Sequence, residues 1–205
     1  IRPFGVVQAA TLPDPVIDYQ PFWMQGTSSA RNWYAAYKGR IALTGSIPDI
    51  ILLDGRPLVY PIGNVTNVSS VTSGYYTHTI TEATTLKSLA IHTTYMDSDG
   101  TIQLMRRFLG GKVNRATLEA SEGDFLRMSL DDISFINYTH NQSGYTFYSA
   151  AISNNAIVYP TTQPYLFSYG SLTLNSTVFA RIRNFRLSIS NNLEPKYYVS
   201  QSAYV

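Results

Sequence analysis

The sequence contains no cysteine among its 205 residues. This absence excludes disulfides and thiolate metal sites, and it favours synthesis inside a cell. Charged residues are also scarce, at 14% of the chain with a formal net charge of +2, whereas an average domain has about 25% charged residues. Such a small net charge argues against binding to nucleic acid or to a membrane through a basic surface.

No apolar run approaches the roughly 20 residues that a membrane-spanning helix needs. The chain begins Ile1-Arg2-Pro3, with neither an initiator methionine nor the layout of a signal peptide, so we expect the N-terminus to be processed or preceded by further residues. The length fits one large β-rich domain covering residues 1–205. Sixteen tyrosines, with many Ser, Thr and Asn, replace the charges. A surface that is polar but nearly uncharged suits wide contacts between proteins.

The stretch after Asp99 predicts a short helix. Ile102, Met105 and Phe108 fall at helical spacing within Thr101–Leu109, and Asp99 is placed to cap the first turn. Gly110-Gly111 would end this helix, because glycine adopts the left-handed conformation without steric cost.

Two strands are predicted to follow this helix, at residues 114–120 and 125–136, joined by a turn at 122–124. The apolar positions of the second strand change phase at Asp131-Asp132, which predicts a β-bulge there. A second change of phase, around Arg183-Asn184, predicts that residues 178–189 form another bent strand. Long strands that bend midway indicate a mainly β fold, a β-sandwich of bent antiparallel sheets flanked by one short α-helix. Further strands are expected at residues 32–44, 50–53, 75–80, 86–96 and 145–159.

Two segments are predicted to lack regular structure. Residues 1–24 contain four prolines and several large apolar side chains, including Phe4, Phe22 and Trp23, so we expect an extended N-terminal arm that docks on another surface. Residues 60–75 are rich in Gly, Ser and Asn and are expected to form a long loop with a role in assembly.

Catalytic, metal and cofactor sites find no support in the sequence. His78, His92 and His140 have no metal-ligand spacing, and Asp97 to Gly100 lacks the acidic residue that closes a calcium loop. Asp131 and Asp132 are adjacent on a strand and are expected to point to opposite faces, which argues against a catalytic pair. We therefore expect no enzyme activity and no cofactor.

The basic residues allow two interpretations. They could be solvated, with some at a helix C-terminus, or they could pair between subunits with Glu119, Glu122, Asp124 or Glu194. The residues concerned are Arg106, Arg107, Lys112, Arg115, Arg181, Arg183 and Arg186.

Several motifs resemble the major tail tube proteins of long-tailed (siphovirus-type) bacteriophages. The first runs from Arg107 to Asn114 and continues in Thr117-Leu118 and residues 126–131. The others lie near the C-terminal end: residues 164–167, 172–174, 185–190 and 191–195. These motifs are turns and strands, and the likeness spans roughly residues 20 to 199 of the sequence.

This resemblance implies a virion structural protein that assembles with itself into stacked hexameric rings, in which the inner sheets of neighbouring subunits join into one ring-wide β-barrel. The tube is the conduit for genome ejection. Implied partners are the tape measure protein, the tail terminator and distal tail proteins, and double-stranded DNA that passes without specific binding. No membrane partner is implied. The implied location is the virion tail, with assembly in the host bacterial cytoplasm.

Candidate site residues follow from this resemblance. The lumen candidates are Asp131 and Asp132. The assembly-interface candidates are Phe4, Phe22, Trp23, Trp33, Arg106, Arg107 and Glu194. Two alternatives remain open: a β-sandwich carbohydrate-binding or adhesin module, in which the tyrosines would form sugar platforms, and a hydrolase on a β-scaffold.

Overall fold

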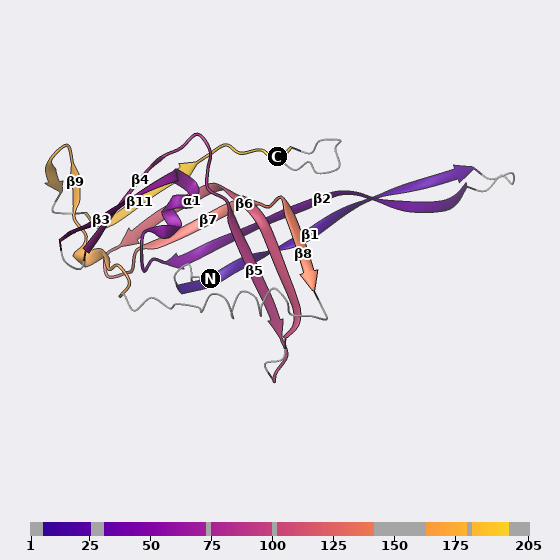
Figure 1. Ribbon diagram of the computed structural model, residues 1–205, viewed down its shortest axis with the longest axis horizontal. Coiled ribbons are helices and arrows are strands. Elements are labelled where there is room, and N and C mark those ends of the chain that lie inside the picture. The colour runs from indigo at the N-terminus through magenta and orange to yellow at the C-terminus, as the bar shows by residue number, and fades with distance from the viewer. Residues whose placement is uncertain are drawn as a thin grey trace.

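One long strand, β6 (Ile102–Ser121), connects the two halves of the fold (Figure 1). Its first half lies between β5 (Leu89–Met96) and β8 (Asn137–Asn141), and its second half lies between β7 (Arg127–Ser134) and β11 (Asn184–Ser190). All four pairings are antiparallel. The computed structural model describes residues 6–25, 31–72, 75–99, 102–141, 163–179 and 182–196.

The main sheet has the order β1-β2-β7-β6-β11. Strands β1 (Val6–Gln25) and β2 (Arg31–Ile51) form a long antiparallel ribbon at one edge. Smaller elements complete the described chain: hairpins β3–β4 (Gly63–Thr72, Tyr75–Glu82) and β9–β10 (Leu172–Leu174, Thr177–Phe179), helix α1 (Val59–Ile62), and the 3₁₀ turns η1 (Arg56–Leu58) and η2 (Phe167–Tyr169). The expected mainly β class, with bent antiparallel sheets and one short helix, is confirmed.

The helix predicted at Thr101–Leu109 is wrong, because residues 102–109 belong to β6. Met105 and Phe108 are both buried, but alternation along a strand places them on opposite faces. Their spacing of three residues therefore reflects a strand that is buried on both sides rather than one face of a helix. Asp99 caps no helix, and its backbone N–H instead donates to Asp97 Oδ1 at 3.1 Å in a turn.

A pair of glycines marks the point where β6 passes from one half of the fold to the other. Gly110 has a φ of +69°, which favours glycine, and a one-residue shift in the β5–β6 register lies between Phe108 and Gly111. A Cβ on Gly111 would lie 2.6 Å from Phe135 Cε1. On the neighbouring chain segment, Ile136 N donates to Leu109 O at 3.0 Å. The β7–β8 connection therefore packs directly against the backbone of this glycine corner.

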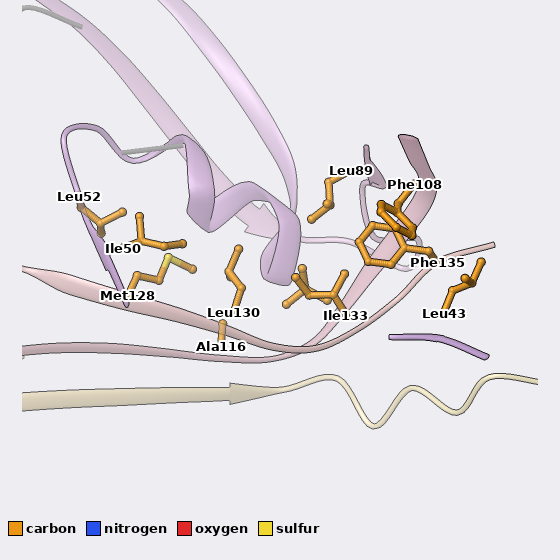
Figure 2. Packing of buried hydrophobic residues seen from close by; sticks show 11 residues of the cluster. Leu43, Ile50, Leu52, Leu89, Phe108, Ala116, Met128, Leu130, Ile133 and Phe135 are labelled. Carbon is orange, nitrogen blue, oxygen red and sulfur yellow. The ribbon is translucent and has the colours of Figure 1, made fainter. Parts of the chain in front are cut away.

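The hydrophobic core spans both halves of the fold and lies between the strands and α1 (Figure 2). The Phe108 and Phe135 rings lie 5.6 Å apart at its corner end. Tyr60 of α1 packs against the cluster from the helix side. The buried members are Leu43, Ile50, Leu52, Leu89, Phe108, Val113, Ala116, Met128, Leu130, Ile133 and Phe135.

The strands and turn predicted between residues 114 and 136 are confirmed, including the bulge. Ile47 and Gly45 of β2 pair with Leu130 and Ile133 of β7, so β7 contains one extra residue at Asp131-Asp132. The prediction that residues 178–189 form one bent strand is wrong. Residues 177–179 and 184–190 are separate strands, β10 and β11, in different sheets.

The two segments predicted to be irregular are also strands where they are described. Residues 6–25 form β1, and the prolines expected to break it lie in an edge strand with several register shifts, where prolines are tolerated. Most of the predicted loop 60–75 is strand β3, consistent with its β-branched Val and Thr residues. Strand β2 merges the two strands expected at 32–44 and 50–53. The strand expected at 145–159 lies outside the described residues.

Replacing Gly111 by alanine should destabilise the subunit by about 1–3 kcal/mol, as overpacking of a core does, because the new Cβ would clash with Phe135. Urea unfolding of the unassembled subunit measures this change. Gly55→Ala is the matched control, since Gly55 has a φ of −82° and nothing within 4 Å of an added Cβ. Equal unfolding midpoints for the two variants would contradict the proposed close packing at the corner.

Candidate assembly surfaces

The distal part of the β1–β2 ribbon extends well beyond the main sheet (Figure 1). Strand β2 pairs with β7 only between Thr44 and Ile51, whereas β1 and β2 pair with each other out to Gln25 and Arg31. Two large apolar side chains on the ribbon, Val16 and Tyr19, are 65% and 60% exposed. A ribbon of two strands is only marginally stable in water by itself, so this element lacks a supporting surface within the described part of the subunit.

A second surface is the face of β7, β6 and β11 that points away from the core. Alternate residues of β6 and β7 carry core side chains, and the residues between them form three cross-strand rows with residues of β11. We call these nine residues the polar face. The rows are Arg127–Glu119–Arg186, Ser129–Thr117–Ser188 and Asp131–Arg115–Ser190. The middle row is made entirely of hydroxyl side chains, and Thr117 Oγ1 lies 3.5 Å from Ser188 Oγ.

The bulge in β7 brings both aspartates to this face. Asp131 lies opposite Arg115 in register, and its Oδ2 accepts a hydrogen bond of 2.9 Å from Ser129 Oγ. Asp132 has a φ of +52°, and its Oδ2 lies 2.8 Å from Arg115 Nη2. The expectation that the two carboxylates point to opposite faces is therefore wrong, because the extra residue of the bulge breaks the alternation.

Arg127 forms a clamp at the other end of the polar face. Its Nη1 donates to Asp49 Oδ1 and Oδ2 at 2.8 and 2.9 Å. Its Nε and Nη2 donate to the two carboxylate oxygens of Asp124 at 3.1 and 3.2 Å. These bonds tie the end of β2 and the start of β7 to the turn before β7.

The clamp shifts the ionisation of its members. The hydrogen bond from Arg127 is the main cause that holds the pKa of the Asp124 carboxyl below its ordinary value, and the backbone N–H of Phe125 adds to the effect. The same bond to Asp124, followed by the bond to Asp49, raises the pKa of Arg127. Both shifts favour the charged pair, as hydrogen bonds to charged forms do.

An apolar groove of about 810 Å³ lies beside β11, lined among others by Leu118, Leu126, Phe167, Ile182 and Phe185. Two exposed side chains, Tyr165 and Val178, also line this groove. A third exposed side chain, Leu187, lies near it on β11. Backbone bonds hold its wall, including Leu126 N to Tyr165 O at 2.8 Å and Phe167 N to Asp124 O at 3.1 Å. Within the described residues β11 pairs only with β6, so its outer edge is open.

The predicted interface residues fall in several places. Phe22, Trp23 and Trp33 lie on the distal ribbon, with Trp23 and Trp33 at opposing register positions. Phe4 lies outside the described residues. Glu194 is exposed in the segment after β11.

The basic residues are divided among different environments, and none of those within the described part of the chain lies on a helix. Arg106 pairs with Asp14 of the ribbon and lies over the Tyr95 ring. Arg107 lies next to it on β6 and is half-buried. Arg115 and Arg106 thus have acidic partners in their own chain, while pairing between subunits stays a prediction. Arg181 lies outside the described residues.

Sequence reasoning missed the Arg127 clamp and the role of Asn191. Asn191 Nδ2 donates to Pro61 O and Val113 O, both at 3.0 Å, and so fastens the segment after β11 to α1 and β6. Arg127 and Asp49 are separated by 78 residues, so no local pattern signals their contact. The only local signal in the sequence was the position of Arg127 shortly after the acidic turn at residues 122–124.

The described residues contain no group of three or more His, Asp or Glu side chains placed to hold a metal ion. None of the helices found among them has the length and apolar character needed to cross a membrane.

Comparison with known proteins gives one family. The sequence matches the phage tail tube protein family over residues 22–204. No curated individual protein matches it significantly. The matched region contains the end of β1 from residue 22 and the whole of β2, β6, β7 and β11.

Replacing Arg127 by glutamine should flatten the dependence of stability on acid pH. The lowered pKa of Asp124 gives a contribution that is present above the unfolded value of about 3.9 and lost as the pH falls through the folded value. Unfolding midpoints measured from pH 2 to 6 test this, with Arg56→Gln as the control, because Arg56 forms a more exposed pair with Asp54. If the unfolding midpoint changed with pH equally in wild type and Arg127→Gln, the result would contradict the clamp.

Proposed function

The chain belongs to the phage tail tube protein family and is a structural protein of the virion tail, and from this premise we propose how it builds the tube. Copies of the subunit close into hexameric rings, and the rings stack into the conduit for genome ejection. The family match favours this function over a carbohydrate-binding module or a hydrolase.

The observation that carries this proposal is the unsupported β1–β2 ribbon. Its strands are 20 and 21 residues long, and its distal part pairs only with itself in the described structure. Burying its exposed apolar side chains against another copy would supply the stabilisation that a lone ribbon lacks. The ribbon, which includes Phe22, Trp23 and Trp33, is therefore the proposed contact between rings. In this proposal it takes the role that the sequence predicts for an extended arm at residues 1–24.

The open edge of β11 supports closure of the ring. An exposed strand edge presents unpaired N–H and C=O groups that can pair with another chain. Pairing of this edge with a neighbouring subunit would extend the sheet around the ring, and a closed ring would leave no edge open. The apolar groove and Leu187 lie beside this edge, where a neighbouring subunit would cover them. Arg107 and Glu194 remain candidates for contacts between subunits.

The polar face is the proposed wall of the lumen. Duplex DNA carries about one negative charge per 1.7 Å, so a wall of free basic groups would retain it. The polar face instead combines three arginines with Glu119 and Asp131, and Asp132 lies against Arg115. Such a mixed surface suits passage without capture.

The remaining partners belong to the same proposal. The tape measure protein would occupy the lumen before the genome, and the tail terminator and distal tail proteins would contact the two ends of the tube. Assembly would take place in the host bacterial cytoplasm, with no membrane involved.

Shortening the ribbon should abolish elongation and leave the subunit folded. Tyr19 and Lys38 are register partners, so residues 20–37 can be replaced by an Asn-Gly turn, which favours a tight hairpin. We expect a thermal unfolding transition close to that of the full chain but no tubes in electron micrographs. Tubes of normal length from the shortened chain would contradict the proposed role of the ribbon.

A lysine on the polar face should slow genome ejection. Asp131→Lys adds a positive group beside Arg115, and phages that carry it should assemble normally but eject DNA more slowly in vitro, most clearly at low salt. Glu82→Lys makes the same change of charge at an exposed site on β4, away from the polar face. Equal ejection rates in the two variants would argue against a lumen position for this face.

A further inference from the structure

We propose that Asp132 masks a phosphate-binding group, the guanidinium of Arg115, and so prevents the polar face from capturing duplex DNA. This inference rests on the proposed placement of the polar face in the lumen. It assigns separate roles to the two neighbouring carboxylates: Asp132 neutralises Arg115 by direct contact, whereas Asp131 only adds negative charge nearby.

The Arg115 guanidinium needs a partner that neutralises it if DNA is to pass without binding. A guanidinium group is always charged and presents a planar fork of donors that matches phosphate oxygens. The Arg115 side chain is 60% exposed, in the middle strand of the polar face, where its row neighbours are Asp131 and Ser190. Without a partner, this group would be well placed to hold a passing phosphate.

The bulge in β7 supplies that partner. In a regular strand, the residue after Asp131 would point to the opposite face. The extra residue and the φ of +52° at Asp132 instead place its carboxylate 2.8 Å from Arg115 Nη2. A left-handed conformation is unfavourable for most residues, and Asp and Asn tolerate it better than most. The backbone geometry at position 132 thus serves the contact with Arg115.

The other two arginines of the polar face have different surroundings. Arg127 is held by two carboxylates, those of Asp49 and Asp124. Arg186 lies opposite Glu119 in register. Arg115 is paired by a single exposed carboxylate, and it is therefore the arginine that one substitution can release.

Two variants of equal net charge separate masking from simple electrostatics. Asp132→Asn removes the partner of Arg115 and keeps a residue that tolerates the left-handed conformation. Asp131→Asn removes the same charge and leaves the Arg115–Asp132 pair intact. Asp132→Gly serves as a second release variant, and thermal unfolding confirms that each protein is folded.

Binding of a fluorescent DNA duplex is measured over a salt series, with unassembled subunits and with tubes. For Asp132→Asn and Asp132→Gly subunits we expect tighter binding and a slope of log K against log salt that is steeper by about 0.9 for each arginine engaged. Asp131→Asn should remain close to wild type, and Arg115→Gln/Asp132→Asn should lose the gain. Equal binding by Asp131→Asn and Asp132→Asn, or no gain in either, would overturn the masking of Arg115.

Tubes distinguish this inference from the proposed function. A slower passage of DNA through Asp132→Asn tubes, together with the gain in subunits, supports both. A gain in subunits with no effect on passage through tubes would support masking and overturn the placement of the polar face in the lumen.

Discussion

The close packing at Gly110-Gly111 is the constraint on which the rest of the structure depends. At this point β6 leaves the pair β5 and β8 and enters the pair β7 and β11. Side chains of Phe135 and Ile136 occupy the space that a Cβ at either glycine would need. The corner thereby fixes how the two halves of the fold meet, and the core residues on both sides pack as one cluster.

This corner also decides which surfaces remain available for assembly. The core covers one side of β6 and β7, and the opposite side of β7, β6 and β11 is left to nine polar residues. At the two ends of the strand order lie the β1–β2 ribbon and the edge of β11, which is open among the residues that the structure describes. The proposed assembly uses these three features, the ribbon, the edge of β11 and the polar face, and all three arise from one bent sheet.

The sequence allowed the fold class, the turn at 122–124 and the bulge at Asp131-Asp132 to be predicted, because each leaves a local signal in composition or phase. The helix at 101–109 was wrong because burial of Met105 and Phe108 on two faces of a strand imitates helical spacing. Strand β1 of the ribbon was missed because its prolines, which are tolerated at a sheet edge, indicated an irregular arm instead. The contacts of Arg115 and Arg127 could not be predicted, since strand register, which only the folded chain defines, brings their partners together.

The shared strand has a mechanical consequence. A force that pulls the two halves of this subunit apart is carried by the covalent backbone of β6, together with the short β7–β8 connection that also crosses between them. Each half of β6 is hydrogen-bonded on both sides, so the strand cannot be peeled away from one half without breaking two ladders together. A single strand therefore belongs to both halves, and the subunit can resist shear at its bend without a disulfide in the chain.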